Sequence, residues 1–168
     1  MVFEKADASR IGQLVDLRLA YLAEDGGALT PEDAARIRRD LPGYFRNHLN
    51  RGLIGFVARE GETLAACALL LIVEKPMSPA FINGRTGTVL NVYTRPEYRR
   101  RGYARRLMEM LMAEAKAREL CVVELKATEM GAALYRSMGF ADDASAYRRM
   151  AWRCGDESPA PKEKRYDI

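Results

Sequence analysis

The sequence has few of the residues on which metal centres, disulfide frameworks and membrane spans depend. It contains three cysteines and one histidine, and no group of histidine, cysteine and acidic residues has the spacing of metal ligands. The odd number of cysteines and the lack of a C-x-x-C pair argue against a disulfide framework. We therefore expect a reduced, cytoplasmic protein in which Cys67 and Cys121 are small core residues. No apolar run approaches the roughly 20 residues that a membrane-spanning helix needs, and residues 1–10 lack the apolar segment of a secretory signal, so we expect no membrane partner.

Two glycine-rich phosphate-binding signatures, G-x-x-x-x-G-K-[ST] and G-x-G-x-x-G, are missing as well. The chain of 168 residues is 48% hydrophobic and 30% charged, which is typical of one soluble domain with its own core. Its net charge of +4 suits an anionic ligand, and it would also suit weak nucleic-acid binding. Because the positive charge is concentrated in residues 95–106, a local anion site is the better interpretation.

The hydrophobic pattern predicts an α/β fold with a mixed central sheet of about six to seven strands flanked by about four helices. The predicted strands cover residues 2–6, 53–59, 63–73, 88–94, 121–127, the region of 140, and 147–152. The predicted helices cover residues 7–24, 31–41, 44–50, 102–119 and 129–137. We expect one domain over residues 1–153 and a disordered tail over residues 154–168, which are polar and aperiodic.

Three local signals support these boundaries. Thr30 and Pro31 are typical of a helix start, and Pro42-Gly43 is expected to break or kink that helix, with a short second helix behind it. Thr128 is a candidate N-cap for the last predicted helix. Gly61 lies in the turn of a predicted hairpin.

The turn before residue 102 carries the strongest functional signal. Residues 95–106 read R-P-E-Y-R-R-R-G-Y-A-R-R and join an apolar strand to an amphipathic helix. The first N–H groups of a helix have no intrahelical partner and its dipole favours negative charge, so this arrangement makes an anion site. We therefore expect a polyphosphorylated ligand held mainly by backbone. Five arginines surround the turn: Arg99, Arg100, Arg101, Arg105 and Arg106.

The spacing R-x-x-G-x-A, from Arg99 through Gly102 to Ala104, resembles the coenzyme-A pyrophosphate loop of the GNAT N-acetyltransferase superfamily. A second motif, A-x-L-Y-x-x-x-G-F, resembles a later helix of that family, which carries a tyrosine near the coenzyme sulfur. The two motifs are about as far apart as the family places them, and the resemblance covers roughly residues 86–152. The second motif consists of Ala132, Leu134, Tyr135, Gly139 and Phe140.

The resemblance implies that acetyl-CoA is the cosubstrate. Backbone N–H groups from Arg100 through Arg105, with Arg101, Gly102, Tyr103 and Ala104 between them, would contact its pyrophosphate, and Gly102 would allow a close approach. In the family, the strand that here contains Val92, Tyr93 and Thr94 splays from its neighbour and pairs with the pantetheine amides. An N–H near Val92 would polarise the thioester oxygen. Thr128 stands where many relatives have an asparagine that touches the pantetheine.

Tyr135 is the sharpest candidate for a catalytic side chain. A phenol near the sulfur can protonate the leaving thiolate, although a tyrosine in this motif can also be a plain core aromatic. The general base stays open between Glu124, Glu74, Asn91 and an ordered water, and we name Glu124 as the candidate. His48, the single histidine, is interpreted as structural or exposed.

These features predict an acetyl-CoA-dependent N-acetyltransferase in which a primary amine attacks the thioester directly within a ternary complex. The acceptor would be a small-molecule or peptide amine, bound near residues 21–50 and 142–147. Acids in these segments either attract a cationic amine or are ordinary loop residues: Glu24, Asp25, Asp142 and Asp143. The alternatives are an acyl-CoA sensor without turnover and, less favoured for lack of a recognised motif, a nucleic-acid binder. A homodimer is compatible with exposed strand edges.

Overall fold

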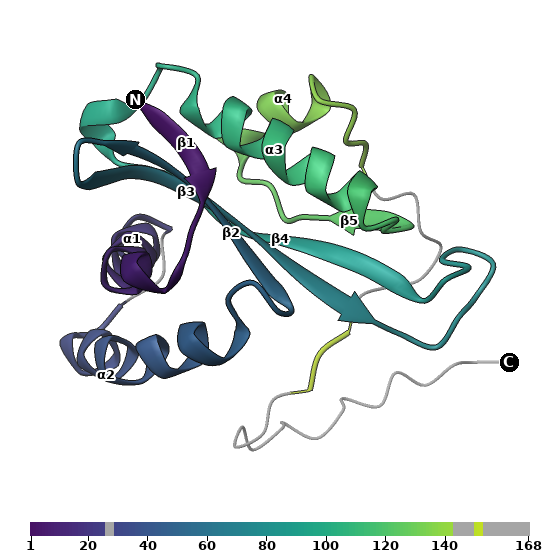
Figure 1. Ribbon diagram of the computed structural model, residues 1–168, viewed down its shortest axis with the longest axis horizontal. Helices are drawn as coiled ribbons and strands as arrows, with labels where there is room; N and C mark the ends of the chain where they lie inside the picture. Colours follow the sequence, from purple (N-terminus) through teal and green to yellow (C-terminus); the bar gives the residue numbers. More distant parts are fainter. Residues whose placement is uncertain (26–28, 143–149, 153–168) are drawn as a thin grey trace, which may run out of the picture.

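The computed structural model describes residues 1–25, 29–142 and 150–152. Within them, five strands form one twisted sheet in the order β1-β2-β3-β4-β5, crossed by helices on both faces (Figure 1). Neighbouring strands are antiparallel from β1 to β4, whereas β5 runs parallel to β4. The strands are β1 (Val2–Lys5), β2 (Leu53–Glu60), β3 (Thr63–Glu74), β4 (Arg85–Thr94) and β5 (Val122–Glu124).

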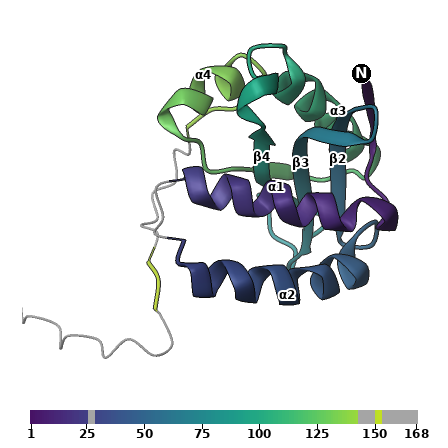
Figure 2. The same cartoon turned by 90° about the vertical axis from the view of Figure 1, so that its left-hand side faces the viewer.

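The helices divide between the two faces of the sheet. In Figure 1, α1 and α2 lie below the sheet and α3 and α4 above it, and Figure 2 shows α1 crossing in front of the strands. The four helices are α1 (Ile11–Glu24), α2 (Pro31–His48), α3 (Tyr103–Ala117) and α4 (Glu129–Arg136), and two short 3-10 turns are η1 (Ala8–Arg10) and η2 (Pro96–Tyr98). The crossover from β4 through α3 to β5 supplies the parallel pair that the alternation of strand and helix predicted.

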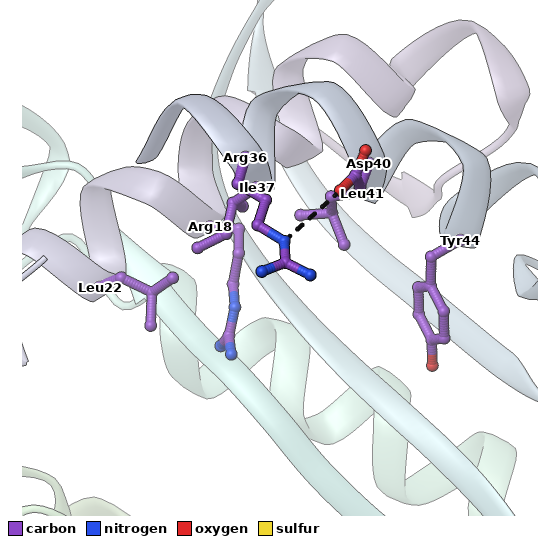
Figure 3. Close-up of a pocket in the computed structure, with 7 residues that line it drawn as sticks. All are labelled: Arg18, Leu22, Arg36, Ile37, Asp40, Leu41 and Tyr44. Atoms are coloured by element: carbon purple, nitrogen blue, oxygen red, sulfur yellow. Dashed lines mark ion pairs between the residues drawn. The ribbon is translucent and has the colours of Figure 1, made fainter. Parts of the chain in front are cut away.

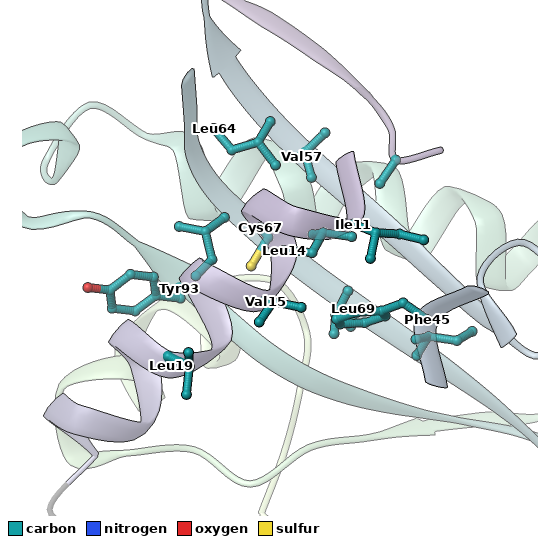
Figure 4. Close-up of a cluster of buried hydrophobic side chains, with 13 residues drawn as sticks. Ile11, Leu14, Val15, Leu19, Phe45, Val57, Leu64, Cys67, Leu69 and Tyr93 are labelled. Carbon is teal, nitrogen blue, oxygen red and sulfur yellow. The ribbon is translucent and has the colours of Figure 1, made fainter. Parts of the chain in front are cut away.

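Each face of the sheet has its own hydrophobic core, because side chains alternate along the strands. Leu53 and Val57 of β2 pack with α1, whereas Ile54 and Phe56 pack with α3. Figure 4 shows the core on the α1 side, where residues of α1, Phe45 of α2 and the sheet meet. Two cores around one sheet fix both helical layers to the same strands.

Several predicted boundaries are confirmed. The Thr30 hydroxyl accepts the Asp33 N–H at 3.1 Å, with Pro31 as the first residue of α2. The Thr128 hydroxyl accepts the Gly131 N–H at 3.2 Å at the start of α4. The β2–β3 hairpin turns at Gly61, whose φ is 57°.

The predicted helix break at Pro42-Gly43 is wrong, because α2 runs through both residues. Proline costs about 3 kcal/mol inside a helix. Ile37, Leu41 and Phe45 lie on one side of α2 and pack on the α1 core. Tertiary burial of that stripe on both sides of the proline outweighs the local penalty.

Two further expectations differ from the structure. Cys67 is buried as expected, but Cys121 is exposed and its thiol donates to Asn83 Oδ1 at 2.8 Å. The described residues contain five strands rather than six to seven. Phe140 and residues 150–152 lie outside any strand, and residues 143–149 and the expected tail 154–168 lie outside the described residues.

Candidate functional site

The turn between β4 and α3 has an unusual backbone. Arg100 has a φ of 63° and Gly102 a φ of 78°, so two residues close together are left-handed. A left-handed arginine is strained, and strain of this kind concentrates at functional sites. Alternation of left- and right-handed residues points successive N–H groups into one concavity, which is a recognised way to bind an anion.

The N–H groups of this turn are free. Every backbone N–H from Arg100 through Arg105 lacks an acceptor within the part of the chain that the structure describes. The next one, that of Arg106, donates to the Gly102 carbonyl at 3.1 Å. Since Gly102 has no side chain to cap α3, the start of the helix offers an uninterrupted run of donors.

Four of the five arginine side chains at the turn already bond to other groups of the protein. Only that of Arg100 makes no hydrogen bond or ion pair to the described residues. The expectation that the ligand contacts mainly backbone is therefore consistent with the geometry. The other bonds are Arg99 to the Thr94 carbonyl (2.9 Å), Arg101 to the Glu97 carbonyl (3.1 Å), Arg105 to Ser137 Oγ (2.7 Å) and Arg106 to Glu109 (3.2 Å).

A groove of about 1180 Å³ opens where β4 and β5 separate. The two strands pair only over residues 86–88 and 122–124, although β4 continues to Thr94. Beyond that point residues 88–92 form one wall and residues 122–129 the other. Tyr135 of α4 and Tyr21 of α1 also line the groove, and these helices lie on opposite faces of the sheet, so the opening joins both faces.

A β-bulge at Asn91 shapes the wall on β4. The register shifts opposite Ala68, and Asn91 has a φ of 51°. Val89 faces the α3 core and Tyr93 the α1 core, although residues four apart in a regular strand share a face. The bulge thus turns the Tyr93 side chain away from α3 and towards α1.

The predicted site residues fall into two groups. Val92, Glu124, Thr128 and Tyr135 line the groove. Outside it lie the residues of the turn and the end of β4: Tyr93, Thr94, Arg99, Arg100, Arg101, Gly102, Tyr103, Ala104 and Arg105.

Tyr93 and Arg99 are tied to α1 through Glu24. The Tyr93 hydroxyl donates to Glu24 Oε1 at 2.5 Å, and Arg99 forms an ion pair with the same carboxylate. These hydrogen bonds hold the pKa of Glu24 below its usual range, and burial together with Glu24 raises the pKa of Tyr93 to about 12. Glu24 therefore links α1 to the turn and is not a free acid of an acceptor groove.

Tyr135 has the surroundings of a proton donor. Its ring lies edge-on to Phe140 with the centroids 6.0 Å apart, and its hydroxyl has no hydrogen-bond partner among the described residues. Burial raises the pKa of this phenol, so it stays neutral at physiological pH. Tyr21 lines the same groove, and burial together with the hydrogen bond to Asp25 raises the pKa of Tyr21.

Glu124 and Asp25 are two acids of the groove that could act as the base, and Glu129 at the start of α4 also lines it. Glu124, at the end of β5, is exposed in the groove and accepts a long contact of 3.4 Å from the Thr88 hydroxyl. Asp25 lines the opposite side and accepts the Tyr21 hydroxyl at 2.8 Å. The Asn91 side chain is already hydrogen-bonded to Arg18 and Cys67, so it is not available as the base.

The remaining acids and the histidine are less suited to act as a base. Glu74 and His48 do not line the groove, and His48 Nδ1 donates to the Tyr44 carbonyl at 2.8 Å. Asp142 lines the groove but pairs with Arg136 at 3.1 Å. Asp143 lies outside the described residues.

A second cavity, of about 390 Å³, lies between α1 and α2. Figure 3 shows its lining, with Leu22, Ile37, Leu41 and Tyr44 around the side chain of Arg18. Arg18 also lines the large groove, so it lies where the two cavities meet.

Sequence reasoning missed Arg18. The signal was present, because the apolar stripe Ile11, Leu14, Val15 and Leu22 of the first helix has its next helical position at residue 18. A charged residue on a core-facing stripe marks a polar site beneath the helix.

The sequence profile described as the acetyltransferase (GNAT) family matches residues 16–140. The resemblance implied a turn that binds the coenzyme, a pair of strands that separate and a later helix that carries a tyrosine. The structure has the turn before α3, the separation of β4 from β5, and Tyr135 on α4. The chain belongs to the acetyltransferase (GNAT) family. No curated protein matches the chain.

Solved structures agree with this assignment. A predicted acetyltransferase from Clostridium acetobutylicum, crystallised with acetyl-CoA, is 28% identical, with a TM-score of 0.77 over 89% of this chain and 95% of that one. A GCN5-related N-acetyltransferase from Ralstonia eutropha JMP134 is 25% identical, with a TM-score of 0.75 over 89% and 97%. A ribosomal-protein-alanine N-acetyltransferase from Brucella melitensis shares the fold, at 20% identity and a TM-score of 0.63 over 90% and 100%. No helix among the described residues is long and apolar enough to cross a membrane.

Proposed function

We propose that the protein transfers an acetyl group from acetyl-CoA to the primary amine of a small molecule or peptide, by direct attack within a ternary complex. The observation that carries this proposal is the groove at the β4–β5 separation, which joins the two faces of the sheet and has the Tyr135 phenol in its wall. A donor can enter from the α3 and α4 side while an acceptor enters from the α1 and α2 side. The two substrates then meet without exchanging places.

The residues present fit coenzyme A as a substrate. The free N–H groups from Arg100 through Arg105 match the oxygens of a pyrophosphate, and the dipole of α3 favours its charge. Beyond residue 88, the edge of β4 that faces β5 has no strand partner among the described residues. Its backbone groups are available to pair with the pantetheine amides, as an added strand would.

The reaction itself needs one bond formed and one broken. The amine nitrogen attacks the thioester carbonyl carbon, the C–S bond breaks, and the sulfur leaves with the bonding electrons. The neutral phenol of Tyr135 gives its proton to the developing thiolate. The proton lost by the amine passes to Glu124 or Asp25, directly or through water.

The test is a pair of measurements on the native protein. Titration with acetyl-CoA in a calorimeter is expected to show micromolar binding, and a panel of primary amines is then tested for release of the coenzyme-A thiol. Release that depends on the amine supports the proposal. Tight binding without release from any amine would favour the acyl-CoA sensor, and absence of binding to a folded chain would overturn the coenzyme site altogether.

A further inference from the structure

Arg18 and Arg136 both line the groove, and they differ in their acidic partners. Arg136 forms an ion pair with Asp142 at 3.1 Å. Within the described residues, no carboxylate lies within 4.0 Å of the Arg18 guanidinium. A half-buried guanidinium without a counter-charge is costly, and an anion that enters the groove would relieve this cost.

The guanidinium of Arg18 is held in a fixed position. Its Nη1 donates to Asn91 Oδ1 at 3.1 Å, and its Cζ lies 5.4 Å from the centre of the Tyr21 ring. Asn91 is itself fixed, because its Nδ2 donates to Cys67 Sγ at 3.2 Å. One N–H of Arg18 is thus used for orientation, and the rest of its planar fork remains for a ligand.

An anion bound to Arg18 would lie close to the place where the thioester is expected to react. Asn91 directly precedes Val92, the residue whose N–H is expected to polarise the thioester. Asp25, which also lines the groove, lies two helical turns from Arg18 on α1. A ligand with its carboxylate on Arg18 would direct a nearby amine towards the thioester, and the proton of that amine could reach Asp25 through water.

The cavity between α1 and α2 adds an apolar surface beside the same arginine. Leu22, Ile37, Leu41 and Tyr44 line it together with Arg18 and the Arg36–Asp40 ion pair, whose atoms are 3.9 Å apart. An apolar side chain on the acceptor has room there while the carboxylate contacts the guanidinium (Figure 3).

We propose that the acceptor is an amino acid with an apolar side chain, and that Arg18 selects it by binding its carboxylate. This inference rests on the proposed acetyltransferase function and names its substrate class. Arg18 is a specificity residue in this scheme and takes no part in the proton transfers.

The experiment compares matched pairs of acceptors that differ only in the carboxylate, phenylalanine with phenethylamine and leucine with isoamylamine. The native protein is expected to prefer the amino acid by about 10- to 100-fold in kcat/KM, the usual range for hydrogen bonds to a charged group. Arg18→Gln is expected to raise KM for the amino acids, so that the ratio of kcat/KM within each pair falls towards one. Arg118→Gln is the control, since Arg118 lines neither cavity and its partner Glu114 keeps an ion pair with Lys5 at 2.7 Å.

Two results would overturn the inference. One is equal use of both members of each pair by the native protein, and the other is a loss in Arg18→Gln that is the same for both members, which indicates a structural role.

Calorimetric titration of each acceptor into protein saturated with coenzyme A separates this inference from the proposed function. Carboxylate-selective binding that Arg18→Gln abolishes, without any turnover, would support the arginine site and contradict catalysis. Turnover of simple amines alone would support the acetyltransferase function and contradict the carboxylate site at Arg18.

Discussion

The starts of helices α2 and α3 are built in opposite ways. At α2, the Thr30 hydroxyl caps the Asp33 N–H, proline occupies the first position, and Glu32 and Asp33 provide negative charge in the first turn. At α3, a left-handed glycine provides no cap, the first turn has no acid, and arginines surround it. At α2, residues of the helix itself cap an N–H donor and place negative charge at the positive end of the helix dipole. At α3, the N–H donors and the dipole are left for an anionic ligand.

The start of α4 shows that the difference is not a matter of which face of the sheet a helix covers. It lies beside α3, yet Thr128 caps it and Glu129 stands in its first turn. This helix contributes the Tyr135 side chain to the groove instead of its backbone. An uncapped start with free N–H groups therefore distinguishes the candidate coenzyme site from α2 and α4. Helix α1 also lacks a side-chain cap, but it continues the 3-10 turn η1, which Asp7 caps.

The largest effect is expected when the start of α3 is given a negative charge, as the start of α2 has. Gly102→Glu is expected to weaken acetyl-CoA binding by about 100-fold or more, because a carboxylate would face the pyrophosphate. Calorimetric titration measures the change. Gly102→Ala is the matched control, since a β-carbon at this position meets no atom within 4 Å and suffers only the strain of φ = 78°.

The two variants together decide the interpretation. If Gly102→Ala loses as much affinity as Gly102→Glu, the backbone conformation matters and the charge does not. If both bind acetyl-CoA like the native protein, the coenzyme does not use the α3 start.

A second change tests whether α4 acts through its side chain. Tyr135→Phe is expected to lower kcat by about 10- to 100-fold with little change in acetyl-CoA affinity, because it removes the proton donor and keeps the ring. The pH profile gives an independent sign. The phenol acts while protonated and burial raises its pKa above the ordinary value of about 10, so native activity should persist to that pH and fall only above it.

The phenylalanine variant should lose that alkaline decline and keep a low, flat rate. An unchanged kcat in Tyr135→Phe would instead mean that Tyr135 is a packing residue against Phe140.

Local rules predicted the parts of this contrast that depend on neighbours in sequence. Thr30, Thr128 and Gly102 each predict where a helix begins, and in the structure each is the N-cap residue of its helix. The continuous α2 could not be predicted in the same way, because burial of Ile37, Leu41 and Phe45 against another helix outweighs the local effect of Pro42.

The groove was less accessible to sequence reasoning because it depends on a strand pairing that stops. Nothing in residues 88–94 or 121–127 states that they part after residues 88 and 124, and only the resemblance implied it. The bulge at Asn91 is equally hidden, and it decides that Tyr93 meets Glu24 on α1. Arg18 could have been found from the apolar stripe that it interrupts, but its lack of an acidic partner is visible only in three dimensions.

A third change tests the α2 side of the comparison. Thr30→Ala is expected to cost about 1 kcal/mol of stability, because it leaves the Asp33 N–H without its cap. Urea denaturation measures this loss, and acetyl-CoA affinity should stay the same in the folded protein. A fall in acetyl-CoA affinity in folded Thr30→Ala would mean that α2 also participates in the coenzyme site.

The smallest expected effect concerns Arg100, whose side chain makes no hydrogen bond or ion pair to the described residues. Arg100→Gln keeps the backbone N–H and removes one charge near the anion, so acetyl-CoA affinity should fall only about 2- to 5-fold at low salt. The difference should shrink as salt rises, since exposed charges are screened. Arg46→Gln, on the exposed side of α2, is the control for overall charge. A loss of affinity from Arg100→Gln as large as that expected from Gly102→Glu would mean that side chains, rather than the free N–H groups of the α3 start, hold the pyrophosphate.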